Sequence, residues 1–110
     1  MSTKRLLFIC SRNRLRSPTA EQVFSQWPGV EVMSAGLDHD AVTPLSADLI
    51  EWADILVVME QAHKNKLNKK FHHCLSGKHV VVLGIPDDYA YMQPELIQRL
   101  KTKVPRLIAL

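Results

Sequence analysis

Cys10 and Arg16 are the residues of this sequence whose types and spacing best suit chemistry. They begin and end the segment Cys-Ser-Arg-Asn-Arg-Leu-Arg, which Ser17 and Pro18 follow. A cysteine thiolate is a nucleophile, and a helix N-terminus or neighbouring cations favour this ionised form over the thiol. The planar guanidinium of an arginine can hold two oxygens of a phosphate group at once. The pair therefore predicts attack of a sulfur nucleophile on a bound phosphate ester.

The flanking sequence predicts that this segment joins a strand to a helix. Leu6 to Cys10 is an uninterrupted apolar run, which is typical of a strand buried on both faces. Ser17 suits the N-cap of a helix, and Pro18 suits its first position. The apolar face of that helix would comprise Ala20, Val23, Phe24 and Trp27. We expect the loop between the two elements to turn its amide N–H groups inward around an oxyanion.

The rest of the chain alternates apolar runs with amphipathic segments. We expect strands at residues 6–10, 30–33, 55–59 and 80–85. We expect helices at residues 17–27, 46–53, 60–71 and 95–103, with Pro105 ending or kinking the last one. This alternation predicts an α/β fold with three layers, α/β/α, in which a four-stranded parallel sheet carries a phosphate-binding loop after its first strand. The 110 residues suit a single domain, 1–110.

Asp87 and Asp88 follow the fourth expected strand. Because ligands bind beyond the carboxyl ends of parallel strands, these carboxylates should lie at the same sheet edge as Cys10. A carboxylic acid there could protonate the leaving oxygen of a phosphoester, and its carboxylate could then deprotonate the water that hydrolyses a phosphocysteine. The residues alone leave open which of the two aspartates would do so.

Composition and charge set broad expectations. The net charge of +3 and the pI near 9.0 permit an anionic substrate without requiring one. Cys10 and Cys74 are too few cysteines for a disulfide framework, which favours a reducing compartment. The first apolar run is too short for a signal sequence or a membrane span. We therefore expect a cytoplasmic monomer without membrane or nucleic-acid partners.

Neither a metal nor a cofactor is expected. The histidines that follow the third expected helix, His72, His73 and His79, show no set of partners with the spacing of metal ligands. The chemistry predicted for Cys10 needs only side chains and water.

These motifs resemble the low-molecular-weight protein tyrosine phosphatase family, whose Cys–Arg–Ser–Pro signature follows the first strand. Further similarity at residues 34–36, 53–63 and 85–89 extends the resemblance over nearly the whole chain. The resemblance implies that Cys10 is the nucleophile, that Arg16 binds phosphate, and that Asp87 acts as acid and then as base. It also implies that Ser17 donates a hydrogen bond to the thiolate and that Asn13 holds the shape of the loop.

The residues expected to contact the substrate are drawn from the loop and from the segment after the fourth strand. They are Ser11, Arg12, Asn13, Arg14, Leu15, Ser17, Asp88 and Tyr89. Three of them depart from the family's pattern: Arg12 replaces a glycine, Leu15 a second cysteine, and Asp88 a proline.

The segment between residues 36 and 46 is shorter than in typical members of the family, which build an aromatic wall there beside the phosphotyrosine ring. Tyr89 and Tyr91 could supply one side of such a wall. Arg12 and Arg14 could recruit a substrate that carries extra negative charge. The resemblance thus implies a phosphatase, whereas specificity for phosphotyrosine does not follow from it.

We therefore expect a cysteine-dependent, phosphotyrosine-phosphatase-like phosphomonoester hydrolase that acts through a phosphocysteine on a phosphorylated protein or small molecule. One alternative is a non-catalytic phosphate-binding regulatory module, which would fit if Arg12 blocked the loop. A second is an arsenate reductase, which would need further cysteines to carry electrons away from Cys10. A third is a cysteine phosphocarrier, in which the phosphocysteine must survive; Arg16 and Asp87 argue against it.

Overall fold

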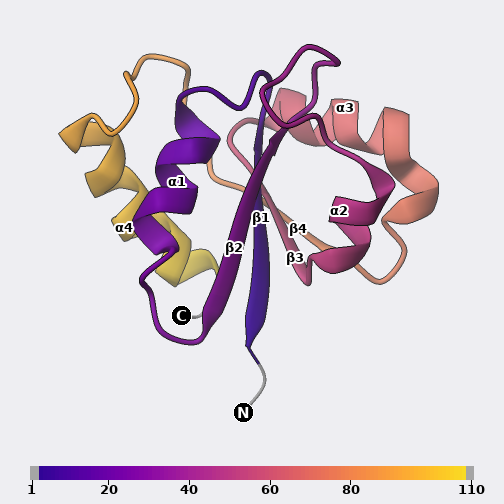
Figure 1. Ribbon diagram of the computed structural model, residues 1–110, viewed down its shortest axis with the longest axis horizontal. Coiled ribbons are helices and arrows are strands. Elements are labelled where there is room, and N and C mark those ends of the chain that lie inside the picture. Colours follow the sequence, from indigo (N-terminus) through magenta and orange to yellow (C-terminus); the bar gives the residue numbers. More distant parts are fainter. Residues whose placement is uncertain (1–2, 109–110) are drawn as a thin grey trace.

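The computed structural model, which describes residues 3–108, confirms the alternation of strands and helices (Figure 1). In chain order, the elements are β1 (Lys4–Cys10), α1 (Arg16–Phe24), β2 (Val30–Gly36), α2 (Ala47–Trp52), β3 (Ile55–Val58), α3 (Gln61–Phe71), the short 3-10 helix η1 (His72–Cys74), β4 (His79–Val82) and α4 (Pro94–Ile108). None of the helices in this part of the chain combines the length and the apolar composition needed to cross a membrane.

The strands form one four-stranded parallel sheet, as predicted, and their order in it is β2-β1-β3-β4. The central strand β1 pairs with β2 on one side, where Cys10 lies opposite Gly36, and with β3 on the other, where Ile9 lies opposite Val58. The chain passes from β1 to β2 and then crosses back to β3, so the strand order reverses at β1. Such a reversal, at the carboxyl ends of the strands, is where α/β sheets bind ligands.

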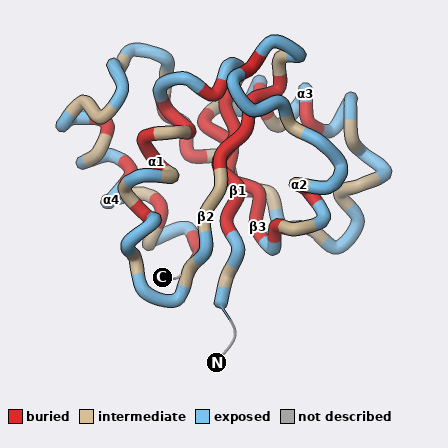
Figure 2. Tube along the Cα trace, in the orientation of Figure 1, coloured by how far each residue is buried: buried red, intermediate tan, exposed pale blue. Residues whose placement is uncertain are grey.

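Helices cover both faces of the sheet and complete the three predicted layers (Figure 1). On one face, Leu6 and Phe8 of β1 pack in a core that includes buried residues of α1 and α4. On the other, Leu7 and Ile9 pack in a core that includes buried residues of α2 and α3. Because side chains alternate between the faces of a strand, the buried run of β1 from Leu6 to Cys10, red in Figure 2, is covered on both faces. The two cores hold the carboxyl end of β1 firmly in place.

The start of α1 differs from the prediction. The helix begins at Arg16 with Leu15 as its N-cap, so Ser17 is not the N-cap that its position before Pro18 predicts. The Ser17 hydroxyl instead lies 3.0 Å from Cys10 Sγ, a contact that sequence rules for capping do not consider. In contrast, Ser46 caps α2 as predicted and accepts a hydrogen bond from the Leu49 N–H.

The last strand and the last helix also differ in length from the prediction. β4 ends at Val82, yet the Leu83 and Ile85 N–H groups still donate to carbonyls of residues 58 and 59. Gly84, with φ of +71°, interrupts the extended backbone between them. α4 continues through Pro105 to Ile108, and the burial of this last apolar residue explains why the proline does not end the helix.

Candidate active site

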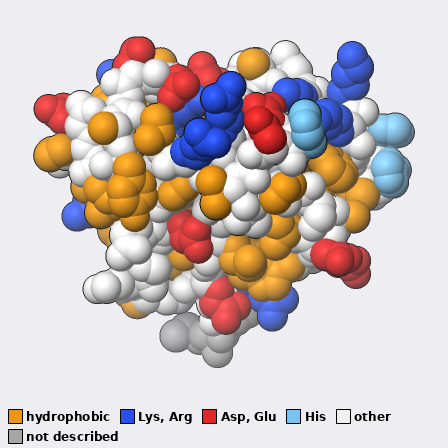
Figure 3. All heavy atoms as spheres, turned by 45° about the horizontal axis from the view of Figure 1, so that its top comes forward, with side chains coloured by type: hydrophobic (Ala, Val, Ile, Leu, Met, Phe, Trp, Pro, Cys, Tyr) orange, Lys and Arg blue, Asp and Glu red, His pale blue; other side chains and the backbone are white. Residues whose placement is uncertain are grey.

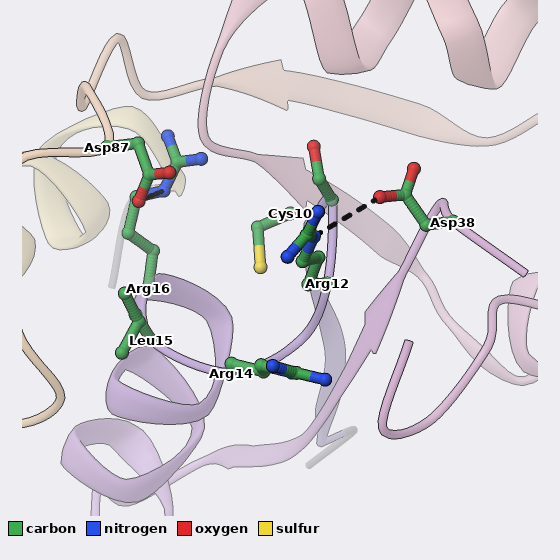
Figure 4. Close-up of a pocket in the computed structure, with 8 residues that line it drawn as sticks. Cys10, Arg12, Arg14, Leu15, Arg16, Asp38 and Asp87 are labelled. Atoms are coloured by element: carbon green, nitrogen blue, oxygen red, sulfur yellow. Dashed lines mark ion pairs between the residues drawn. The ribbon is translucent and has the colours of Figure 1, made fainter. Parts of the chain in front are cut away.

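Residues 11–15 connect β1 to α1 and form the loop around Cys10 (Figure 4). The loop's outer carbonyls are held by the segment that follows β2: the Cys10, Ser11 and Arg12 carbonyls accept hydrogen bonds from the N–H groups of residues 37, 38 and 42, at 2.9, 2.9 and 3.1 Å. Each carbonyl points opposite to the N–H of its own peptide plane. Fixing these carbonyls outward therefore turns the N–H groups of residues 11–13 towards the inside of the loop.

Two residues allow the loop to close so tightly. Asn13 has φ of +57°, a left-handed conformation that asparagine tolerates better than most residues, and its N–H lies 3.3 Å from Cys10 Sγ. Gly36 lies directly beneath the loop: a Cβ there would be 2.6 Å from the Ser11 carbonyl oxygen and 3.0 Å from the Arg12 carbonyl carbon. The absence of a side chain at this position is thus a condition for the shape of the loop.

A buried polar cluster surrounds the Cys10 sulfur. Asn13 Nδ2 donates to Ser17 Oγ at 2.9 Å, and Asn13 Oδ1 accepts from the Thr43 N–H at 3.2 Å. Because Ser17 Oγ accepts this hydrogen bond, its own proton can be donated to Cys10 Sγ, 3.0 Å away. The arrangement suits a thiolate, which accepts hydrogen bonds and donates none.

Arg16 is almost fully buried at the end of the loop. Its Nη1 donates to Glu60 Oε2 and to the Ile85 carbonyl, both at 2.8 Å. Its Nε lies 3.7 Å from Asp87 Oδ1. With both Nη1 protons engaged, the protons on Nε and Nη2 remain for a ligand. The hydrogen bond from Arg16 lowers the pKa of Glu60 below its ordinary value, so this carboxylate stays ionised beside the guanidinium.

His63 supports the loop from α3. Its Nδ1 accepts from the Glu60 N–H at 3.1 Å, and its Nε2 lies 3.1 Å from Ser11 Oγ. Burial, followed by the nearby Arg16 charge, lowers the pKa of His63 below its ordinary value. The ring is therefore neutral near pH 7, with its proton on Nε2, where it can be donated to the Ser11 hydroxyl.

A pocket of about 660 Å³ opens above the loop. It is lined by Cys10, Ser11, Arg12, Arg14, Leu15, Arg16, Asp38 and Asp87. Figure 4 places Asp87 and Arg16 on one side of Cys10 and Arg12 and Asp38 on the other. The structure thus brings the three predicted catalytic residues, Cys10, Arg16 and Asp87, around one cavity.

The other predicted substrate contacts lie outside the pocket lining. Asn13 and Ser17 are buried behind the loop, where they contact the sulfur. Asp88 is exposed beside the pocket without lining it. Tyr89 packs against the core beneath Arg99, whose Cζ lies 5.8 Å from the ring centroid, and Tyr91 lines a neighbouring pocket that shares Arg14.

Sequence reasoning gave no catalytic or binding role to Glu60, His63 and Asp38. A signal did exist for the first: an acidic residue directly after the third strand falls at the same sheet edge as Cys10. His63 occupied a position on the apolar face of its helix, and nothing in the sequence pairs it with Ser11. Within residues 3–108, no group of three or more histidine, cysteine or carboxylate side chains is arranged to hold a metal ion.

No family model matches the chain, and no curated protein sequence matches it. Solved structures do match. The YwlE arginine phosphatase from Geobacillus stearothermophilus superposes with a TM-score of 0.77 and 24% identity, over 96% of this chain and 91% of that one. The tyrosine phosphatase Wzb from Escherichia coli K30, in complex with phosphate, gives 0.75 and 23%, over 97% of both chains.

The low-molecular-weight protein tyrosine phosphatase from T. tengcongensis also matches, with a TM-score of 0.77 and 21% identity over 97% of this chain and 99% of that one. The chain therefore has the fold of low-molecular-weight protein tyrosine phosphatases over nearly its whole length. The resemblance predicted from the motifs is confirmed at the level of the fold.

Proposed function

We propose that this protein is a phosphomonoester hydrolase that acts through a phosphocysteine intermediate. The observation that carries the proposal is the position of Cys10 Sγ inside a loop of inward N–H groups, with Arg16 and Asp87 beside the same pocket. The names of its structural neighbours, tyrosine and arginine phosphatases, support phosphoryl transfer from a substrate at such a site.

In the first step, Cys10 Sγ attacks phosphorus and the bond from phosphorus to the leaving oxygen breaks. The Asp87 carboxylic acid gives its proton to that oxygen, so that an alcohol leaves. The loop N–H groups and the free Arg16 donors hold the three equatorial oxygens, where negative charge is greatest in the transition state. The Ser17 hydroxyl and the Asn13 N–H, 3.0 and 3.3 Å from Cys10 Sγ, hold the sulfur in position for attack.

In the second step, water attacks the phosphocysteine. The Asp87 carboxylate takes a proton from this water, and the bond between sulfur and phosphorus breaks. Phosphate is released, and Cys10 returns to its thiolate form. The nucleophile and the acid are then in their starting states. No further reactant is needed to balance the cycle.

We assign the proton transfers to Asp87 and not to Asp88. Asp87 lines the pocket, and Arg16 Nε lies 3.7 Å from its carboxylate, close to the bound phosphoryl group. Asp88, which is exposed like Asp87, lies outside the lining.

A non-catalytic phosphate-binding module is the alternative, and it required Arg12 to block the loop. The Arg12 side chain is 65% exposed at the rim of the pocket, which supports an open loop and favours catalysis over simple binding. We also propose that the protein is a cytoplasmic monomer. The free thiols of Cys10 and Cys74 support the reducing compartment. Sedimentation of the purified protein tests the monomer.

Hydrolysis of p-nitrophenyl phosphate between pH 5 and 7.5 tests the function. We expect turnover by the native protein, none by Cys10→Ser, and about a hundredfold lower kcat for Asp87→Asn. Cys74→Ser, a change to the other thiol, is the matched control and should keep activity. Acid quenching followed by mass spectrometry should find a phosphoryl group on Cys10. A folded protein without turnover across this pH range would contradict the proposal.

A further inference from the structure

Arg16 already has carboxylates to offset its charge. Glu60 accepts a hydrogen bond from its Nη1 at 2.8 Å, and Asp87 Oδ1 lies 3.7 Å from its Nε. The side chain is 5% exposed, so these contacts hold it in position as well as offsetting its charge. What Arg16 offers to a ligand is therefore a set of oriented donors for one phosphoryl group.

Arg12 and Arg14 have far fewer partners. The carboxylate that pairs with Arg12 is Asp38, 3.9 Å away, and Asp38 accepts a shorter hydrogen bond from Lys66 at 3.0 Å. Arg14 is exposed and has no ion pair within residues 3–108. Arg12 thus shares its carboxylate partner, Asp38, with Lys66. Figure 3 shows Lys and Arg side chains gathered at this edge of the molecule.

The pocket rim offers charge where an aromatic ring would need apolar contact. Leu15 is the one large apolar side chain in the lining, and no aromatic residue lines the pocket. Tyr89 is packed beneath Arg99, and Tyr91 lines the neighbouring pocket. Sites for uncharged organic groups are lined mainly by apolar and aromatic side chains. The rim of this pocket is instead lined mainly by charged side chains.

The cavity is larger than one phosphoryl group requires. Its volume of about 660 Å³ is that of a site for a whole small molecule. Figure 4 places the Arg12 and Arg14 side chains on the side of Cys10 away from Asp87. The leaving oxygen lies near Asp87 when the phosphate occupies the loop. The rest of the leaving group can then extend across the pocket towards the two arginines, which have few or no carboxylate partners.

We propose that this site selects phosphate monoesters whose leaving group carries a second anionic group, a carboxylate or a phosphoryl group, near the scissile phosphate. The inference rests on the proposed hydrolase function and names its substrate class. Arg12 and Arg14 bind the second anion, since guanidinium groups form paired hydrogen bonds with carboxylate and phosphate oxygens. The same two charges repel a leaving group that is cationic.

Four aryl phosphates that differ in the charge of one substituent test this selection. They are phenyl phosphates with a carbamoylmethyl, carboxymethyl, phosphonomethyl or aminomethyl group at the 3-position. The methylene insulates the ring, so the four phenols have similar leaving ability. We expect kcat/KM for the carboxymethyl ester to exceed that of the neutral carbamoylmethyl ester by about fivefold. The aminomethyl ester should be the poorest substrate, and the phosphonomethyl ester shows whether a second phosphoryl group is preferred to a carboxylate.

Variants locate the source of the preference. Arg14→Gln and Arg12→Gln should each reduce the ratio of kcat/KM between the carboxymethyl and carbamoylmethyl esters, and Arg14→Lys should keep part of it. Lys101→Gln removes the same unit of charge from an exposed position on α4 and should leave the ratio unchanged. Added salt should also lower the ratio, because it screens charges at an exposed rim.

The outcomes separate this inference from the function on which it rests. If the neutral ester is hydrolysed and the ratio stays near one, the selection is wrong and the hydrolase proposal stands. If no ester is hydrolysed, the hydrolase proposal fails, and calorimetry with the corresponding benzylphosphonates decides the selection. Tighter binding of the carboxymethyl compound than of the carbamoylmethyl compound would support it, and equal affinities would overturn it.

Discussion

His63 Nε2 lies 3.1 Å from Ser11 Oγ, so a residue of α3 is tied to the first position of the phosphate loop. The contact joins the loop to the core that contains Leu7 and Ile9, because Leu67 of the same helix is fully buried in that core. Through Glu60, which donates its N–H to His63 Nδ1 and accepts from Arg16, the same helix also holds the arginine at the other end of the loop. The two ends of the loop therefore depend on one turn of α3.

Replacing His63 by alanine should destabilise the protein and loosen the loop. The change leaves the Glu60 N–H and the Ser11 hydroxyl without their partner, at a cost of about 1–3 kcal/mol. Urea denaturation measures the loss in the free energy of unfolding. His72→Ala, at an exposed position in η1, is the control and should change stability little. Equal stabilities for the two variants would contradict the role given to His63.

Stability should fall as the pH is lowered through the ordinary histidine range. Burial lowers the pKa of folded His63 below its ordinary value of 6.5. Below pH 6.5 the unfolded chain then binds more protons than the folded one, so acid favours unfolding. The contribution of His63 is fully present above that pH. His63→Gln, which does not titrate, should flatten this part of the stability profile, measured by urea denaturation from pH 5 to 8.

Protonation of two carboxylates should cause a second loss of stability at lower pH. The hydrogen bond from Arg16 lowers the pKa of Glu60, and that from Lys66 lowers the pKa of Asp38. Their stabilising effect is complete above the ordinary values of 4.5 and 3.8 and is lost as the pH falls through the lowered values. Glu60→Gln should remove part of this acid sensitivity. An unchanged profile below pH 4.5 would show that Glu60 does not contribute.

Gly36→Ala should damage the site more than the fold. The added Cβ would lie 2.6 Å from the Ser11 carbonyl oxygen, so either the loop or β2 must move. We expect a loss of about 1–3 kcal/mol in stability, as for other overpacked sites, together with a fall in kcat/KM of at least about tenfold. Gly77→Ala is the matched control: its Cβ meets no atom within 4 Å, although φ of +76° makes it strained. That variant should lose stability and keep kcat/KM.

Glu60→Gln should reduce phosphate binding through Arg16. Glutamine can still accept a hydrogen bond at this position, but the buried guanidinium loses its ionised partner at 2.8 Å. Since hydrogen bonds to charged groups contribute about 1.5–3 kcal/mol, we expect the inhibition constant for inorganic phosphate to rise about tenfold or more. Glu51→Gln, an exposed acidic residue on α2, provides the control. Unchanged inhibition in Glu60→Gln would show that Ile85 alone orients the arginine.

The fold could be predicted because its signals are local. Apolar runs mark the strands, and the alternation of strands with helices indicates a parallel sheet. The order of the strands, and with it the reversal at β1, is known from the structure alone. Cys10, Arg16 and Asp87 could be predicted because each stands next to a strand end or a helix start. The prediction that the last helix ends at residue 103 was wrong. Proline disfavours the interior of a helix, but the burial of Ile108 outweighs this preference at Pro105.

The supporting residues could not be predicted in the same way. His63 and Ser11 are 52 positions apart, and their contact exists only because α3 packs against the sheet beside β1. The role of Gly36 depends on how closely β2 approaches the loop, which is a matter of tertiary distance. The pairing of Arg12 with Asp38 likewise arises from the path of the segment after β2.

The hydrogen bonds from residues 37, 38 and 42 to the loop carbonyls have a consequence for the energetics of binding. Because these bonds are made between groups of the chain itself, the fold alone orients the N–H groups of the loop. The conformational entropy of ordering the loop is therefore lost when the chain folds and is not subtracted from the affinity for substrate. An anion that enters finds its hydration shell replaced by donors already in place.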